Sequence, residues 1–422
     1  MRREGVEPSC LATLASETSA SAIPPPPRKS TSSIAYLDNS VKLISNITSS
    51  AAAGPACRST SARPHSRCGR QGPRLGRHPL AASFIKELRL GFFTAIILFL
   101  KGETMFLDSF KITLSGVGQI FLLGAIGYFL FKRNILSSEG LDSLNRIVID
   151  VTLPIMIFCQ LVKDFSFRVY ANWWLFPILS ILITLAGLAI GYIFSRTVKG
   201  EQHRLQFIGL VAFQNSGYLP LALIGSLLSA LDLGVMFIYL FLFLAGFNLL
   251  MFSLGAELIC YHKLRKFEIM NLFSAPVVAT IIGLITVYLG LNRFIPEVVL
   301  KPLRLVGDCT LPLAMFVVGA NLAEIKLTQI NKKEMALALL AKLVVLPALG
   351  LLLVLKLKFS ALVGLLIVMQ LAMPPATLLS VLTRHYKKED LLISQGIFLS
   401  HLASIITIPV FLSLYLYLKT LP

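Results

Sequence analysis

Charged residues are scarce in this 422-residue sequence. Lys, Arg, Asp and Glu make up only 14% of it, whereas 55% of the residues are hydrophobic and the mean hydropathy is +0.77. A soluble protein could not hide so much apolar surface in its core. The formal net charge of +18 does not indicate nucleic-acid binding, because the basic residues are spread over short loops and an N-terminal tail.

Several chemical motifs are also missing. The six cysteines show no C-x-x-C pair and no metal-binding spacing, so we expect neither a disulfide framework nor a metal site; they are Cys10, Cys57, Cys68, Cys159, Cys260 and Cys309. No G-x-x-x-x-G-K-[ST] loop and no hydrolase signature occurs. The sequence therefore predicts a protein that is not an enzyme, needs no cofactor and draws energy from an ion gradient or the membrane potential.

Long apolar runs are abundant from about Ile112 onward. Runs of this length are typical of membrane-spanning helices, and they lack the alternation of a membrane barrel. The loops between them are short, which predicts one compact all-α polytopic bundle. The ten predicted spans are 112–131, 144–162, 172–194, 205–229, 233–259, 272–291, 298–321, 335–355, 360–383 and 391–418.

Residues 1–104 have a different composition, dominated by Ser, Ala, Pro and Arg. Such a segment is expected to be disordered. The apolar run at 90–100 is too short to span a bilayer and is interpreted as a surface-lying or cryptic segment. Because Met105 opens a more ordinary start, we hypothesise that residues 1–104 are an overextended gene start. N-terminal sequencing of native protein that begins well before Met105 would reject this hypothesis.

Lys and Arg residues predict the orientation. The loops after spans 1, 3, 5, 7 and 9 carry more of them than the loops on the opposite side, so they are expected to be cytoplasmic. Both ends of the ten-span bundle then lie outside an inner or plasma membrane. The basic residues are Lys132, Arg133, Arg146, Arg196, Lys199, Arg204, Lys263, Arg265, Lys266, Lys326, Lys332, Lys333, Arg384, Lys387 and Lys388.

The chain contains an internal repeat at an offset of 158 residues. The offset aligns "VIDVTLPIMIF" (148–158) with "VGDCTLPLAMF" (306–316), and "QNSGYLP" of span 4 with "AMPPATL" of span 9. Each copy holds five spans, an odd number, so the second copy enters the membrane from the opposite side. We therefore predict two inverted five-helix repeats, 105–262 and 263–422, a plan common among secondary transporters.

Spans 4 and 9 contain residues that break helices. Pro220 in span 4, and Pro374 and Pro375 in span 9, are expected to leave half-helices whose N-termini attract an anion. Asn215 and Ser216 would add polar groups, and Gly217 would let the backbone approach a ligand closely. An ordinary packed proline kink is the alternative, but matching breaks in both halves favour a binding site near the midplane.

Other polar residues also lie inside the spans. Asp150 and Asp308 must face the bundle interior, pair with a donor or be protonated; they are candidates for a proton carrier or gate, or for interhelical hydrogen bonds. His401 is the only histidine inside a span and is a further proton candidate. Interhelical hydrogen bonding is the commoner role for such residues, and for Gln214, Asn248, Asn321 and Gln370. Gly124 and Gly127 indicate close helix packing.

From Met105 onward the chain resembles the auxin efflux carrier family. The resemblance rests on "LDSLNRIVIDVTLPIMIF", "FQNSGYLPLALI", "LRLVGDCTLPLAMFVVGANLA" and "QLAMPPATLLSVLTRHY". It implies ten spans in two inverted repeats, similar to the sodium–bile acid symporter fold, with spans 4 and 9 crossing at the substrate site. The very short loop between spans 5 and 6 resembles the compact bacterial members, described as malate or malonate permeases, and not the plant members with a long central loop.

The sequence thus predicts a secondary transporter for a small organic anion such as a carboxylate, which moves by an elevator or rocking motion. H⁺ or Na⁺ would be the coupling ion, and a homodimer is left open. The first alternative is a sodium-coupled symporter of the bile-acid type. The second is a membrane sensor or scaffold that transports nothing.

Overall fold

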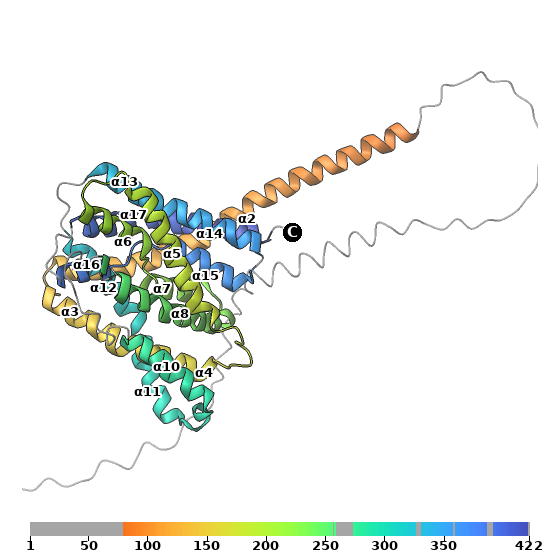
Figure 1. The fold of residues 1–422 in the computed structure, drawn as a ribbon. Coiled ribbons are helices and arrows are strands. Elements are labelled where there is room, and N and C mark those ends of the chain that lie inside the picture. The colour runs from red at the N-terminus through yellow and green to blue at the C-terminus, as the bar shows by residue number, and fades with distance from the viewer. Residues whose placement is uncertain are drawn as a thin grey trace, which may run out of the picture. The chain divides into compact units, whose positions relative to one another are not determined.

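The computed structural model describes residues 79–255, 257–258, 273–325, 331–357, 359–385 and 391–420, and side chains from residue 105 onward (Figure 1). These parts are helical apart from connecting loops and one isolated bridge. Three segments, η1, η2 and η5, are π-helical turns; η1 and η5 join α-helices end to end, η2 follows α8, and η4 is a 3₁₀ turn. The elements are α2 (Pro79–Lys132), α3 (Ser138–Arg146), η1 (Ile147–Thr152), α4 (Leu153–Asp164), α5 (Leu175–Ser195), α6 (Glu201–Ala212), α7 (Tyr218–Leu227), α8 (Ala230–Leu250), η2 (Met251–Gly255), α10 (Ala275–Tyr288), η4 (Leu291–Phe294), α11 (Glu297–Asp308), α12 (Thr310–Glu324), α13 (Lys332–Leu340), η5 (Ala341–Val345), α14 (Leu346–Leu357), α15 (Ala361–Ala372), α16 (Leu378–His385) and α17 (Leu391–Thr420).

Six helical segments are long and apolar enough to cross a membrane: Met105–Lys132, Leu175–Ser195, Ala230–Gly255, Glu297–Glu324, Lys332–Leu357 and Leu391–Lys419. They coincide with predicted spans 1, 3, 5, 7, 8 and 10. The other four predicted spans fall on shorter or interrupted helices, among them the apolar helices α7, α10 and α15. The chain is therefore an all-helical, multi-pass membrane protein.

Backbone contact between glycines joins α2 to α12. A Cβ on Gly319 would overlap the backbone of Gly124, and a Cβ on Gly127 would overlap the backbone of Phe316. Small residues allow membrane helices to approach this closely. The sequence prediction of close packing around Gly124 and Gly127 is thus confirmed.

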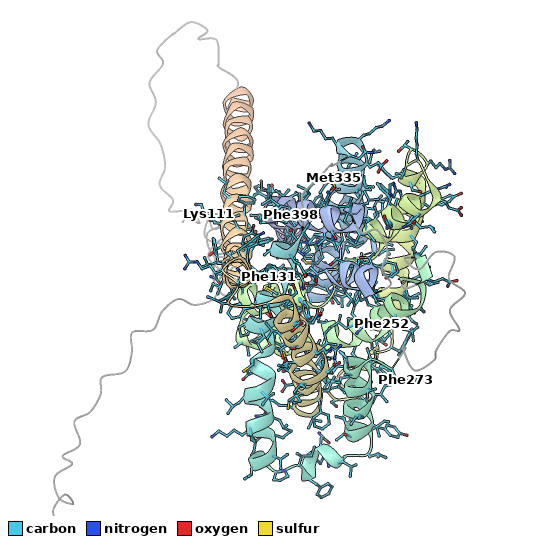
Figure 2. All side chains as sticks on the ribbon, turned by 90° about the vertical axis from the view of Figure 1, so that its left-hand side faces the viewer. Lys111, Phe131, Phe252, Phe273, Met335 and Phe398 are labelled. Carbon is cyan, nitrogen blue, oxygen red and sulfur yellow. The ribbon has the colours of Figure 1, made fainter. Side chains whose placement is uncertain are left out.

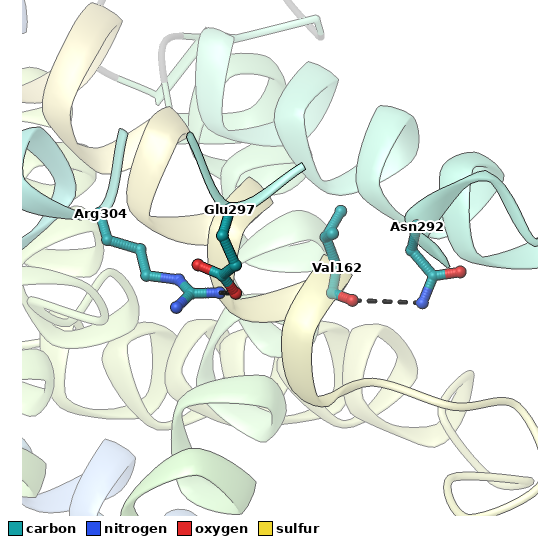
Figure 3. A network of polar contacts seen from close by, with 4 residues as sticks. All are labelled: Val162, Asn292, Glu297 and Arg304. Carbon is teal, nitrogen blue, oxygen red and sulfur yellow. Dashed lines mark hydrogen bonds and ion pairs between the residues drawn. The ribbon is translucent and has the colours of Figure 1, made fainter. Parts of the chain in front are cut away.

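The α10–α11 hairpin packs against α4. Asn292 in η4 donates a hydrogen bond to the carbonyl of Val162 at 3.3 Å, and Arg304 lies 3.4 Å from Glu297 across two turns of α11 (Figure 3). Gly307 packs against the backbone of Met156. The Asn292–Val162 bond and the Gly307–Met156 packing join the start of the second predicted repeat to the second span of the first, whereas the Arg304–Glu297 pair lies within α11.

Two expectations about position need correction. Of the three alternatives for Asp150 and Asp308, an interior position is wrong, because both residues are exposed on the outer faces of η1 and α11 of the isolated chain. Pairing with a donor or protonation stays a prediction. Helix α2 begins at Pro79, well before the first predicted span. Residues 1–78 and the loop at 263–266 lie outside the described residues, so the predictions made for them stay predictions.

Candidate binding site between two interrupted helices

Two helices are interrupted in mid-course. Helix α6 ends at Ala212 and α7 begins at Tyr218, so residues 213–217 form an extended link. In the same way α15 ends at Ala372 and α16 begins at Leu378, leaving the link 373–377. Almost all residues of both links are buried. Buried links of this kind must satisfy their backbone polar groups within the protein.

The two links pair with each other. The Asn215 N–H donates to the Pro374 carbonyl at 2.8 Å, and the Ala376 N–H donates to the Phe213 carbonyl at 2.9 Å. These bonds form an isolated antiparallel bridge between Gln214 and Pro375. A side chain adds a third connection, because Gln370 Nε2 donates to the Ser216 carbonyl at 3.2 Å. Segments about 158 residues apart in the chain therefore meet in the core.

Pro220 is not at the break, although the sequence analysis expected it to cause one. It is the third residue of α7, and the interruption precedes it at 213–217. The first turn of a helix has no intrahelical acceptors for its N–H groups, so proline costs no hydrogen bond there. Pro374 and Pro375, in contrast, lie within the second link itself, as expected.

A cavity of ≈ 90 Å³ lies beside the crossing links. One wall is the first link, from Gln214 to Gly217, and the second link contributes Ala376 and Thr377. The remaining polar wall is made by Asn145, Tyr218, Asn248, Ser274 and Asn321. About 10–15 Å³ of such space accommodates one water, so the cavity has room for several waters or a small ligand. No charged side chain lines it among the residues that the structure describes.

Hydrogen-bond donors without acceptors are concentrated in this wall. Within the described part of the chain, Gln214 Nε2, Asn215 Nδ2 and the hydroxyls of Ser216 and Ser274 are buried and lack partners. Tyr218 is different, since its hydroxyl donates to Asn145 Oδ1 at 3.1 Å. Leaving a buried donor unpaired costs about 1–3 kcal/mol. The wall is thus built to receive acceptor atoms, and the N-terminal ends of α7 and α16 favour negative charge.

The structure brings only part of the predicted site together. Asn215, Ser216 and Gly217 line the cavity, and Pro374 and Pro375 form the link behind it. The remaining candidates, Pro220, Asp150, Asp308 and His401, do not line it. His401 is buried in α17, where Nδ1 lies 2.8 Å from the Ile397 carbonyl. Their proposed roles as proton or gate residues stay predictions.

Sequence reasoning missed or undervalued several residues. Gln214, Asn248 and Asn321 were assigned to helix packing, yet all three line the cavity. Their type and position in apolar spans were visible, but not the direction in which each side chain points. Lys342 was missed entirely, although a lysine inside the apolar run 335–355 is a clear signal.

Comparisons with known proteins agree on one class. A family described as "Membrane transport protein" matches residues 113–271 and 260–412. An uncharacterized transporter of Methanocaldococcus jannaschii, MJ1031, is 26% identical over 300 residues, which cover 68% of this chain and 94% of that protein. An uncharacterized transporter of Methanothermobacter thermautotrophicus is 25% identical over 69% of this chain and 94% of its own length. Protein PIN-LIKES 6 of Arabidopsis thaliana is 29% identical over 124 residues, and the match spans only 29% of each chain.

Proposed function

The chain belongs to the membrane transport protein family, and from this premise we propose that it is a secondary transporter that carries a small organic anion, such as a carboxylate, through the crossing of its two interrupted helices. The resemblance to the auxin efflux carrier family noted above is confirmed by the family match and by the PIN-LIKES relative. The family and the relatives named as transporters place the protein among transporters and not among enzymes.

The unpaired donors of the cavity wall carry the proposal of an anion. Gln214 Nε2, Asn215 Nδ2 and Ser216 Oγ are consecutive in the chain, buried and without acceptors among the described residues. A carboxylate offers only acceptor atoms and can take several donors at once. The cavity volume of ≈ 90 Å³ suits a small ligand, and the absence of charged lining residues from the described wall favours a single negative charge held by amides and helix ends.

We also propose the membrane arrangement inferred from the sequence. Ten spans would form two inverted repeats, with both ends outside the inner or plasma membrane. The two breaks support this arrangement, because they lie at corresponding positions of the 158-residue repeat and pair with each other. Alternating access would then move the unit that carries α6, α7, α15 and α16 relative to the rest of the bundle.

A carboxylate uptake screen tests the transport function. Full-length protein reconstituted in liposomes is offered radiolabelled mono- and dicarboxylates, with and without an imposed membrane potential or pH gradient. We expect saturable uptake of at least one small carboxylate above protein-free liposomes. Well-inserted protein with no flux for any of them would contradict the proposal and favour a membrane sensor or scaffold.

A pair of serine variants then tests the site. Ser216→Ala removes a hydroxyl of the cavity wall, so it should raise the KM for the transported anion about tenfold, the effect of losing one hydrogen bond to a charged group. Ser180→Ala is the matched control: Ser180 is equally buried, but its hydroxyl donates to the Pro177 carbonyl at 2.7 Å and lies outside the cavity. Equal KM values for the two variants would place the site elsewhere.

A further inference from the structure

A lysine is buried in the interior of a membrane span. Lys342 is 1% exposed and lies in the π-helical turn η5, inside the span Lys332–Leu357. Ten residues of helix separate it from the start of this span, roughly 15 Å at 1.5 Å per residue. A lysine near a span end can extend its ammonium group to the water interface, but Lys342 is too deep and too well covered to do so.

No carboxylate compensates this lysine among the residues that the structure describes. Lys342 forms no ion pair there, and besides the chain neighbours α13 and α14 the helices packed against η5 are α5, α6, α15 and α17. The one acidic residue of α13, Glu334, lies eight residues before Lys342, about 12 Å along the helix. Helices α5, α15 and α17 contain no Asp or Glu, and the one acidic residue of α6, Glu201, is exposed at its first turn. Among the described residues, dipoles are therefore the remaining source of compensating negative potential.

The position of η5 shows which dipoles these are. Gly364 packs against Val354, and Gly350 packs against Leu371, so α14 runs antiparallel to α15. Gly350 is already level with the last turn of α15. Because η5 precedes α14 in the chain, η5 lies at or beyond the point where α15 ends, next to the second link.

The carbonyl ends of two interrupted helices therefore lie on this side of the crossing. Helices α6 and α15 both contact η5, and both end at the links, at Ala212 and Ala372. The C-terminal end of a helix attracts a cation. The unpaired donors of the cavity wall lie instead near helix N-termini, where α7 and α16 begin. The crossing is thus divided into an N–H side and a carbonyl side.

Two buried acceptor atoms lie on helices that pack against η5. Gln370 in the last turn of α15 uses Nε2 as a donor to the Ser216 carbonyl, and its Oε1 has no partner within the described chain. His401 lies on α17, which also contacts η5. With Nδ1 donating to the Ile397 carbonyl, its Nε2 is an acceptor, and it too has no partner there. An ammonium group has three donors and suits such surroundings.

We propose that Lys342 is a built-in cation that takes the place of a bound metal cation at the carbonyl side of the crossing, so that the protein holds its two helix ends together without Na⁺. Lys342 is then a positioning residue, since it acts on the links and not on the substrate. The consequence for transport, uptake that is independent of Na⁺, rests on the proposed function. The cation-binding property itself does not, and it can be measured without flux.

Thermal unfolding of purified full-length protein in detergent provides the test. Wild type, Lys342→Ala and Lys333→Ala are compared in NaCl and in choline chloride at equal ionic strength, with Na⁺ alone as the probe. Lys333→Ala is the matched control, because it removes an exposed lysine from the helix that leads into η5. We expect equal Tm values in the two salts for wild type and for Lys333→Ala. Lys342→Ala should have a lower Tm in choline chloride and a saturable recovery of at least about 3 °C with Na⁺, because only this variant gains a cation site.

The outcomes separate a charge role from simple packing. If folded Lys342→Ala has the same Tm in NaCl and in choline chloride, the proposal is wrong, because lost packing alone would explain the destabilisation. A wild-type Tm that rises with Na⁺, or ²²Na⁺ bound by the wild type, would overturn it as well, even if no Lys342 variant folds. If Lys342→Ala binds ²²Na⁺ and the wild type does not, the proposal stands whether or not a carboxylate is transported.

Discussion

The two links at the crossing have the same backbone role and opposite chemistry. In the 158-residue repeat, Gln214 to Gly217 correspond to Ala372 to Pro375. The first link presents amide and hydroxyl donors to the cavity. The second contributes only Ala376 and Thr377 to the lining, has its methionine and prolines behind the cavity, and supplies backbone partners for the first link. The lesson is a division of labour between the links, in which the first supplies the unpaired donors and the second fixes the backbone of the crossing.

The same contrast extends to the neighbouring spans. Lys342 in the second repeat corresponds to Thr184 in the first, at the same offset. Thr184 is fully buried too, but its hydroxyl is satisfied by the Ser180 carbonyl at 2.8 Å within its own helix. A charged residue therefore occurs in only one of two equivalent places, so the two repeats differ in charge at this position.

Replacing the central polar residue of the first link should have the largest effect. Asn215→Ala removes an unpaired donor of the cavity wall, and a hydrogen bond to a charged ligand is worth about 1.5–3 kcal/mol. Carboxylate uptake in liposomes should fall by a factor of about ten to a hundred, with the protein still inserted. Met373→Leu, at the equivalent residue of the second link, should stay within about threefold, because the exchange conserves volume. Similar losses in both variants would refute the division of labour.

Breaking the side-chain connection between the repeats should have a smaller effect, mainly on stability. Gln370→Leu leaves the buried Ser216 carbonyl without its Nε2 donor, at a cost of about 1–3 kcal/mol. The Tm in detergent should drop by about 3–10 °C. Asn292→Leu removes a partly buried amide donor of similar length on the periphery and serves as the control. An unchanged Tm for Gln370→Leu would mean that the backbone bridge alone joins the links.

The proline substitutions should have the smallest effects on uptake, and these effects should differ between the two links. Pro375→Ala frees a backbone torsion in the second link, so it should reduce uptake about two- to fivefold, in line with an entropic effect of about 0.4–1 kcal/mol. Pro220→Ala should change uptake less, because Pro220 already sits in the first turn of α7, where helical geometry is set by its neighbours. A greater loss at Pro220 would show that the first link, too, depends on proline for its shape.

Local sequence signals predicted where the helices break, but not how the pieces face. Asn215, Gly217 and the prolines marked both interruptions, since they cluster within a few residues at matching positions of both halves. The displacement of the first break to 213–217 could not be predicted, because proline is compatible with both a break and a first turn. For Asp150 and Asp308 the cost of exposing a charge to lipid left three alternatives, an interior position, pairing with a donor or protonation; the first does not hold, because both lie on the outside of the isolated chain. Which neighbour covers a helix face is a tertiary property that periodicity alone does not determine.

The glycine contact between α2 and α12 restricts how the bundle can move. The Gly319 and Gly124 backbones are in direct contact, so no side chains separate the two helices there. If one helix slid past the other, its larger side chains would clash with the backbone of its neighbour. Helix α2 comes from the first half of the sequence and α12 from the second. We therefore expect α2 and α12 to move or stay still together in a transport cycle, so that the two halves of the sequence do not rock as separate blocks.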